Sequence, residues 1–187
     1  MPDAVVTVIV GFVLTTVVGG LLGYFFQRRS WSHQYRIEAD ARQRDRAVEL
    51  FDEMSRLLDR RLYRMRRLYW ALVNDGDRTP SETSRDRMAD YVAVLYDWND
   101  NINRNLALLQ RYFGQGMRDR LDNEVGVLQR ELGGELESVF YGRSRLADAG
   151  NSIEERFTRL AGLIYHFNVD MITSIQHGDL GTRRSAA

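Results

Sequence analysis

The chain has no cysteine and no lysine, and it has only two prolines and three histidines. Without cysteine it can form neither a disulfide framework nor a thiolate metal site, which fits a reducing cytoplasm. The histidines stand far apart without the spacing of metal ligands, so we expect no metal and no cofactor.

All 26 basic residues are arginine, and 26 acidic residues balance them. Arginine suits phosphate contacts, but genomic codon usage would give the same bias, and the balanced charge disfavours nucleic acid as a partner.

Charge is also missing from Ala4 to Phe26, a run of 23 residues. As a helix this run is roughly 35 Å long, enough to cross a hydrocarbon core of about 30 Å. A cleaved signal peptide would need a basic start, a shorter apolar stretch and a small-residue cleavage site. The nearest basic residues, Arg28 and Arg29, follow the run, so the positive-inside bias places residues 27–187 in the cytoplasm and the N-terminus outside. The sequence therefore predicts a single-pass protein of the inner membrane, with the lipid bilayer as its first partner.

One face of the predicted span, residues 4–26, consists of small residues. They recur every four positions, at Gly11, Thr15, Gly19 and Gly23. Such a ridge lets a second helix approach closely, and Gly19 and Gly23 form a GxxxG pair. Glycine is also common in isolated membrane helices, but the register of these residues favours packing against another span, and hence a homo-oligomer.

The rest of the chain reads as helix, because apolar residues recur at helical spacing and no strand-like alternation is evident. No glycine or proline occurs between Tyr24 and Asn74, so we expect one continuous helix over about 4–73. Three further helices are expected over about 81–113, 117–141 and 151–177. Four amphipathic helices with short links predict an all-α fold, in which the transmembrane helix continues into a cytoplasmic antiparallel four-helix bundle over 43–177. Residues 178–187 are expected to be a disordered tail.

Two details of the predicted bundle bear on its packing. The core stripe of the first helix is expected to be Phe51, Met54, Leu58, Met65 and Leu72. The third helix contains Gly126, Gly133 and Gly134, each of which weakens it by about 1 kcal/mol relative to alanine. These glycines would permit a kink or a close helix crossing.

The segment 27–42 is a mostly polar helical neck that has no partner within the predicted bundle. Trp31, Tyr35 and Ile37 interrupt its polar sequence. The neck could stand solvated as a stalk, or these three residues could pack against neighbouring protomers. Because a lone helix is marginal in water, the neck also favours homo-oligomerisation.

An arginine ridge lies on the first helix, where Arg56, Arg60, Arg64 and Arg67 recur at helical spacing. It has two interpretations. The ridge could be a plain surface whose arginines pair with acidic residues of the second or third helix. Alternatively, Arg60, Arg64 and Arg67 could contact nucleic acid or an acidic partner, whereas lipid lies beyond a Debye length.

Asparagine and aspartate are unusually dense over 97–105 of the second helix, although both are indifferent helix formers. Asn101 and Asn105 are four residues apart and flank the core stripe. They could form a plain polar face, or they could hydrogen bond across the bundle or between protomers. A buried amide network of this kind would help to specify the register of the bundle.

The fourth helix carries Arg159 and His166, two turns apart on its outer flank, with Asp170 one turn further. A solvated face with local charge pairing is one interpretation. The pattern also resembles HEPN-type ribonucleases, in which paired arginine and histidine residues of two protomers form the site. The resemblance implies that Arg159 would stabilise phosphate charge and that His166 would act as general acid or base. Leu160 departs from the family, where a polar residue is common, and the spacing is at its long limit.

The layout of one N-terminal membrane helix and a small HEPN-like bundle is similar to the membrane accessory proteins of type VI-B CRISPR systems. That resemblance implies a defence-associated membrane pore, or a ribonuclease that uses Arg159 and His166. The residues themselves favour a function that involves no catalysis. In this leading interpretation the protein assembles as a homo-oligomer and holds a cytoplasmic protein partner at the membrane.

Overall fold

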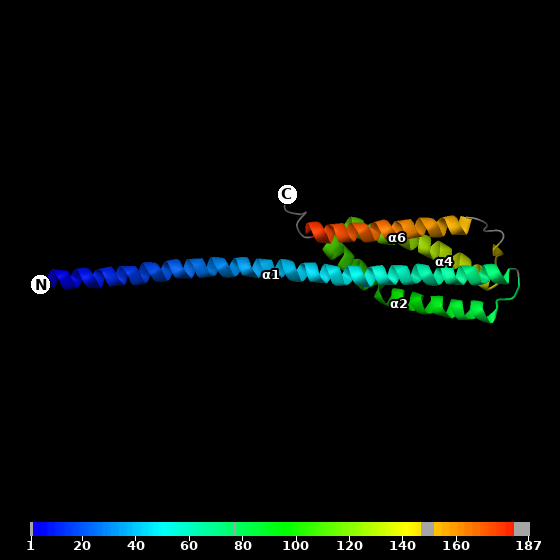
Figure 1. The fold of residues 1–187 in the computed structure, drawn as a ribbon, viewed down its shortest axis with the longest axis horizontal. Coiled ribbons are helices and arrows are strands. Elements are labelled where there is room, and N and C mark those ends of the chain that lie inside the picture. The colour runs from blue at the N-terminus through cyan, green and yellow to red at the C-terminus, as the bar shows by residue number, and fades with distance from the viewer. Residues whose placement is uncertain (1, 77, 147–151, 182–187) are drawn as a thin grey trace. The chain divides into compact units, whose positions relative to one another are not determined.

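The computed structural model describes residues 2–76, 78–146 and 152–181, and every element within them is helical (Figure 1). The chain divides into two compact units, Met1–Gln43 and Arg44–Ala187. Over residues 2–36 the structure describes only some side chains, those of Gly20, Tyr24, Gln27, Trp31, Gln34 and Tyr35.

Helix α1 runs from Pro2 to Asp75, close to the range expected from the absence of helix breakers. Proline suits the first position of a helix, because its missing N–H would have no partner there. Gly76 ends the helix with a positive φ of 62°, and its N–H donates to the carbonyl of Leu72 at 3.1 Å. Glycine adopts this left-handed conformation without steric cost.

In the part of the chain that the structure describes, no helix has an apolar segment long enough to cross a membrane. Most side chains of the predicted span Ala4–Phe26 lie outside that part, including those of Gly11, Thr15, Gly19 and Gly23. The transmembrane helix is therefore not supported by the structure and stays a prediction.

The second unit is an antiparallel helical bundle. It contains the C-terminal part of α1, α2 (Glu82–Phe113), α3 (Gln115–Arg120), the π-helical turn η1 (Leu121–Val125), α4 (Gly126–Phe140) and α6 (Ser152–His177). Contacts between α1 and α2 join Glu53 to Arg104 and Arg64 to Asp90, so the two helices run in opposite directions. The same reversal holds between α1 and α6, where Ser55 hydrogen bonds to Asn168 and Tyr69 to Glu154. The predicted all-α bundle is confirmed.

The core is built from apolar stripes on the helices. The residues buried on η1, α4 and α6 include Leu121, Val125, Leu128, Leu132, Leu136, Ile153, Phe157, Leu160, Ile164, Phe167 and Met171. On α1 the stripe is wider than predicted, because this helix packs against both α2 and α6. Leu50, Leu57 and Leu68 are buried there, whereas Phe51 is only half-buried.

The third predicted helix is present, but it contains a π-helical turn. In the range expected as one helix over 117–141, the chain forms α3, η1 and α4 without a non-helical residue between them. Gly133 is fully packed because the Tyr91 hydroxyl of α2 lies against its Cα. The glycine thus permits a close approach, as predicted, but the group that approaches is a side chain and not a helix backbone.

The segment after α6 differs from its predicted disorder over residues 178–181. Gly178 ends α6 with φ 69°, and Leu180 is then buried against the core, only 6 % exposed. The N–H of Gly181 donates to the carbonyl of Tyr112 at 2.7 Å. Burial of one leucine and one backbone hydrogen bond are enough to hold this short segment. Residues 182–187 lie outside the described residues.

A hydrogen-bonded junction joins α1 to α2. The Ser81 hydroxyl caps α2 by accepting from the N–H of Ser84 at 3.2 Å. The Asp75 carboxylate accepts from the Ser84 hydroxyl at 2.5 Å and from the Ser81 N–H at 2.9 Å. These bonds, first that of Ser84, hold the pKa of Asp75 below its usual value.

Replacement of Asp75 is expected to cost stability in a pH-dependent manner. Because its folded pKa is depressed, the stabilisation is present above the unfolded pKa of about 3.9 and is lost as the pH falls through the folded pKa. Melting temperatures of wild type and Asp75→Asn should therefore differ at pH 6, and the difference should shrink as the pH falls below about 3.9. Asp52→Asn, at an exposed position of α1, is the control. A difference for Asp75→Asn that is the same at both pH values would contradict this role.

Candidate functional site

The predicted arginine ridge lies along the seam between α1 and α2, and much of it is neutralised there. Arg60 forms an ion pair with Asp97, and Arg64 pairs with Asp90 at 2.6 Å. For these two arginines the plain interpretation, pairing with acidic residues of the second helix, is confirmed. Exposed ion pairs contribute little stability, but they remove the local basic excess that an acidic partner would need.

Arg67 differs from these two arginines, because within the described residues no carboxylate pairs with it. Its guanidinium donates to the Tyr63 hydroxyl at 3.2 Å and lies 5.7 Å from the centre of that ring. Tyr63 and Trp70 are 54 % and 52 % exposed on the same helix. Spaced at i, i+4 and i+7, the three residues place a cation between two aromatic side chains on the outer face of α1.

The predicted amide network is replaced by local hydrogen bonds. Asn101 donates to the carbonyl of Asp97 at 2.9 Å, one turn back on α2. Asn105 is 1 % exposed, and its Oδ1 accepts from the Arg104 guanidinium at 3.3 Å. Arg104 in turn forms an ion pair with Glu53 of α1. Among the described residues, Asn105 therefore acts on the α1–α2 contact by orienting its neighbour Arg104.

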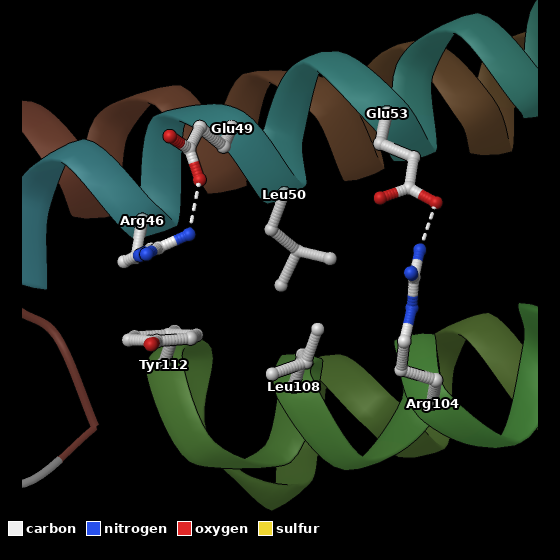
Figure 2. Close-up of a pocket in the computed structure, with 7 residues that line it drawn as sticks. All are labelled: Arg46, Glu49, Leu50, Glu53, Arg104, Leu108 and Tyr112. Atoms are coloured by element: carbon white, nitrogen blue, oxygen red, sulfur yellow. Dashed lines mark hydrogen bonds and ion pairs between the residues drawn. The ribbon is translucent and has the colours of Figure 1, made fainter.

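A groove of about 370 Å³ lies along the α1–α2 seam (Figure 2). Leu50 and Leu108 form its apolar floor. Two ion pairs flank the floor. Arg46 pairs with Glu49 at 3.0 Å, and Arg104 pairs with Glu53. Tyr112 lies at the end of the groove next to Arg46. An apolar floor between neutralised charges suits contact with an apolar side chain better than it suits acid–base chemistry.

Arg61 is a buried cation that the sequence analysis did not separate from its exposed neighbours. It is 4 % exposed, and its guanidinium lies 5.2 Å from the Trp98 ring centre. Burial lowers the pKa of Arg61, and Tyr91 opposes this effect. Burial raises the pKa of Tyr91, because it disfavours the charged phenolate. One signal was present in the sequence, because Arg61 follows Met54 by seven residues and so continues the core stripe.

Gln129 of α4 is a second buried polar residue. It is fully buried, and within the described residues neither of its amide atoms has a hydrogen-bond partner; the same holds for Nε of Arg61. An unsatisfied buried polar group costs about 1–3 kcal/mol. The core therefore contains polar groups that weaken it.

The structure places both predicted catalytic residues, Arg159 and His166, at exposed positions of α6. The His166 ring lies 5.4 Å from that of Tyr165, and within the described residues neither Arg159 nor His166 forms a hydrogen bond or ion pair. Asp170, the third residue of this pattern, forms an ion pair with Arg120 of α3. The site implied by the HEPN resemblance needs a second protomer, so catalysis by these residues stays a prediction.

Among the described residues no group of three histidine, aspartate or glutamate side chains could hold a metal ion. No protein-family model, no curated protein and no solved structure matches this chain. The resemblance to HEPN-like membrane accessory proteins therefore rests on the sequence layout alone, and function has to be argued from the residues.

Proposed function

We propose that this protein is a membrane-anchored helical bundle that works by homo-oligomeric assembly and holds a protein partner at the cytoplasmic face. The observation that carries the proposal is the exposure of large apolar side chains in the first unit. Trp31 is 65 %, Tyr35 74 % and Ile37 56 % exposed. Large exposed apolar side chains that gather on a protein surface mark places that another protein covers, and here Trp31 and Tyr35, four residues apart, share one face of the helix.

The anchor is supported by the sequence. The uncharged run Ala4–Phe26 and the arginines directly after it meet the criteria of length and charge asymmetry for a span with a cytoplasmic C-terminal part. The small-residue ridge Gly11, Thr15, Gly19 and Gly23 would then bring spans together in the bilayer. Assembly through the span and through Trp31, Tyr35 and Ile37 would present several copies of the bundle side by side to one partner.

Assembly is tested on the full chain, extracted from carbonate-washed membranes into detergent and weighed by light scattering. The wild-type particle should contain a multiple of the chain mass of 21.7 kDa. The triple change Trp31→Ser, Tyr35→Ser, Ile37→Ser should weaken association at least tenfold, or about 1.4 kcal/mol. The matched control is Gln27→Ser with Gln34→Ser, two exposed polar positions of the same segment. A chain that washes off the membrane would contradict the anchor, and a monomeric wild-type particle would contradict assembly.

A further inference from the structure

Two loops at one end of the bundle enclose a hollow that no part of the proposed function uses. Its volume is about 550 Å³, within the range of roughly 300–1,000 Å³ that is usual for small-molecule sites. One side comes from the connection between α1 and α2, and the other from the end of α4 and the residues after it. The lining residues are Gly76, Arg78, Thr79, Pro80, Val139, Phe140, Tyr141, Gly142, Ser144, Arg145 and Leu146.

Local backbone structure shapes both walls of the hollow. Gly76 and Gly142 have φ of 62° and 68°, so each turns the chain sharply at a helix end. After Gly142 the chain is held by the Ser138 carbonyl, which accepts from the N–H of Arg143 at 2.8 Å. Pro80 fixes φ on the opposite wall. The hollow is thus set by turns that the sequence strongly favours.

Among the described residues that line the hollow, the charged ones are Arg78 and Arg145. None of its described lining residues is acidic. Within the described part of the chain, the side chains of Arg78 and Arg145 have neither an ion pair nor a hydrogen bond, whereas Arg60, Arg64 and Arg156 each pair with a carboxylate. Asp75, the acidic residue at the start of this loop, is already bound to Ser81 and Ser84. Two guanidinium groups at one hollow therefore remain available to an anion.

The other lining residues add an apolar wall and hydroxyl groups to the two arginines. Val139, Phe140 and Leu146 are partly buried against the core and offer an apolar wall. Thr79 and Ser144 add hydroxyl groups that can donate to an anion. Arginine forks match the oxygen geometry of phosphate. The geometry points to a binding site for a small phosphate monoester with a compact apolar or aromatic portion, held by Arg78 and Arg145 through its phosphate.

The test uses the full chain in detergent and phenyl phosphate as the probe, followed by saturation-transfer NMR on the ring protons. Wild type should bind the probe saturably, inorganic phosphate should compete, and uncharged phenol should bind at least tenfold more weakly. Arg78→Ala with Arg145→Ala should weaken binding by about tenfold or more, as expected for lost charge-assisted hydrogen bonds. Arg85→Ala removes an exposed arginine of α2 that does not line the hollow, so its binding should stay within about twofold.

Three outcomes would overturn the site. The first is an absence of saturable binding to wild type at about 10 mM probe. The second is an unchanged probe affinity in the Arg78/Arg145 double variant. The third is an equal loss of probe affinity in Arg85→Ala, which would show diffuse electrostatic attraction only. Both arginines are exposed, so the variant should fold, which far-UV circular dichroism verifies. Arg78→Gln with Arg145→Gln, which keeps the side chains polar, decides the question if the alanine variant does not fold.

Discussion

Gly133→Ala is expected to destabilise the bundle by about 3 kcal/mol, in spite of the higher helix propensity of alanine. A Cβ at this position would lie closer to the Tyr91 hydroxyl oxygen than 3.0 Å, a separation that real Cβ atoms essentially never show. Tyr91 cannot easily move away, because it is 2 % exposed and packed within the core. Urea unfolding of the full chain in detergent, followed by far-UV circular dichroism, measures the effect.

The next residue along α4 provides the control for this prediction. A Cβ on Gly134 would meet nothing within 4 Å, so Gly134→Ala should be neutral or stabilise the helix by up to about 1 kcal/mol. Tyr91→Phe should partly rescue Gly133→Ala, because the nearest atom is then the ring carbon Cζ at 3.3 Å. The rescue appears as a coupling energy in the double-mutant cycle. Equal stabilities of the two alanine variants would show that the close approach carries no cost.

Gln129→Met is expected to raise the free energy of unfolding by about 2 kcal/mol, or the melting temperature by roughly 4–8 °C. Gln129 is fully buried on α4, and in the described part of the chain no group satisfies its amide. Methionine has a similar length and volume, so it keeps the packing and removes two unsatisfied polar atoms. Thermal unfolding of the full chain in detergent is the measurement.

Asn105 provides the matched contrast. It is as deeply buried as Gln129, but its Oδ1 accepts from the Arg104 guanidinium, which also pairs with Glu53. Asn105→Leu should therefore lower the melting temperature, because it removes a charge-assisted hydrogen bond and leaves Arg104 less well oriented. If Gln129→Met also lowers the melting temperature, the Gln129 amide has a structural partner, such as a buried water.

Helix boundaries could largely be predicted from the sequence, because they depend on residues close together in the chain. The absence of glycine and proline after Gly23 predicted one long helix, and α1 reaches Asp75. The second helix was expected over about 81–113, and α2 spans Glu82–Phe113. The fourth helix was likewise expected over about 151–177, and α6 spans Ser152–His177.

The roles of individual polar residues depended on the tertiary structure. Arg60 and Arg61 are adjacent, yet Arg60 pairs with Asp97 at the surface and Arg61 is buried beside Trp98. Consecutive residues of a helix point about 100° apart, and only the positions of α2 and α6 decide how wide a face of α1 the core covers. The groove and the hollow arise in the same way. The groove at Leu50 and the hollow between the two loops join residues far apart in the chain, whereas periodicity and capping act over only a few residues.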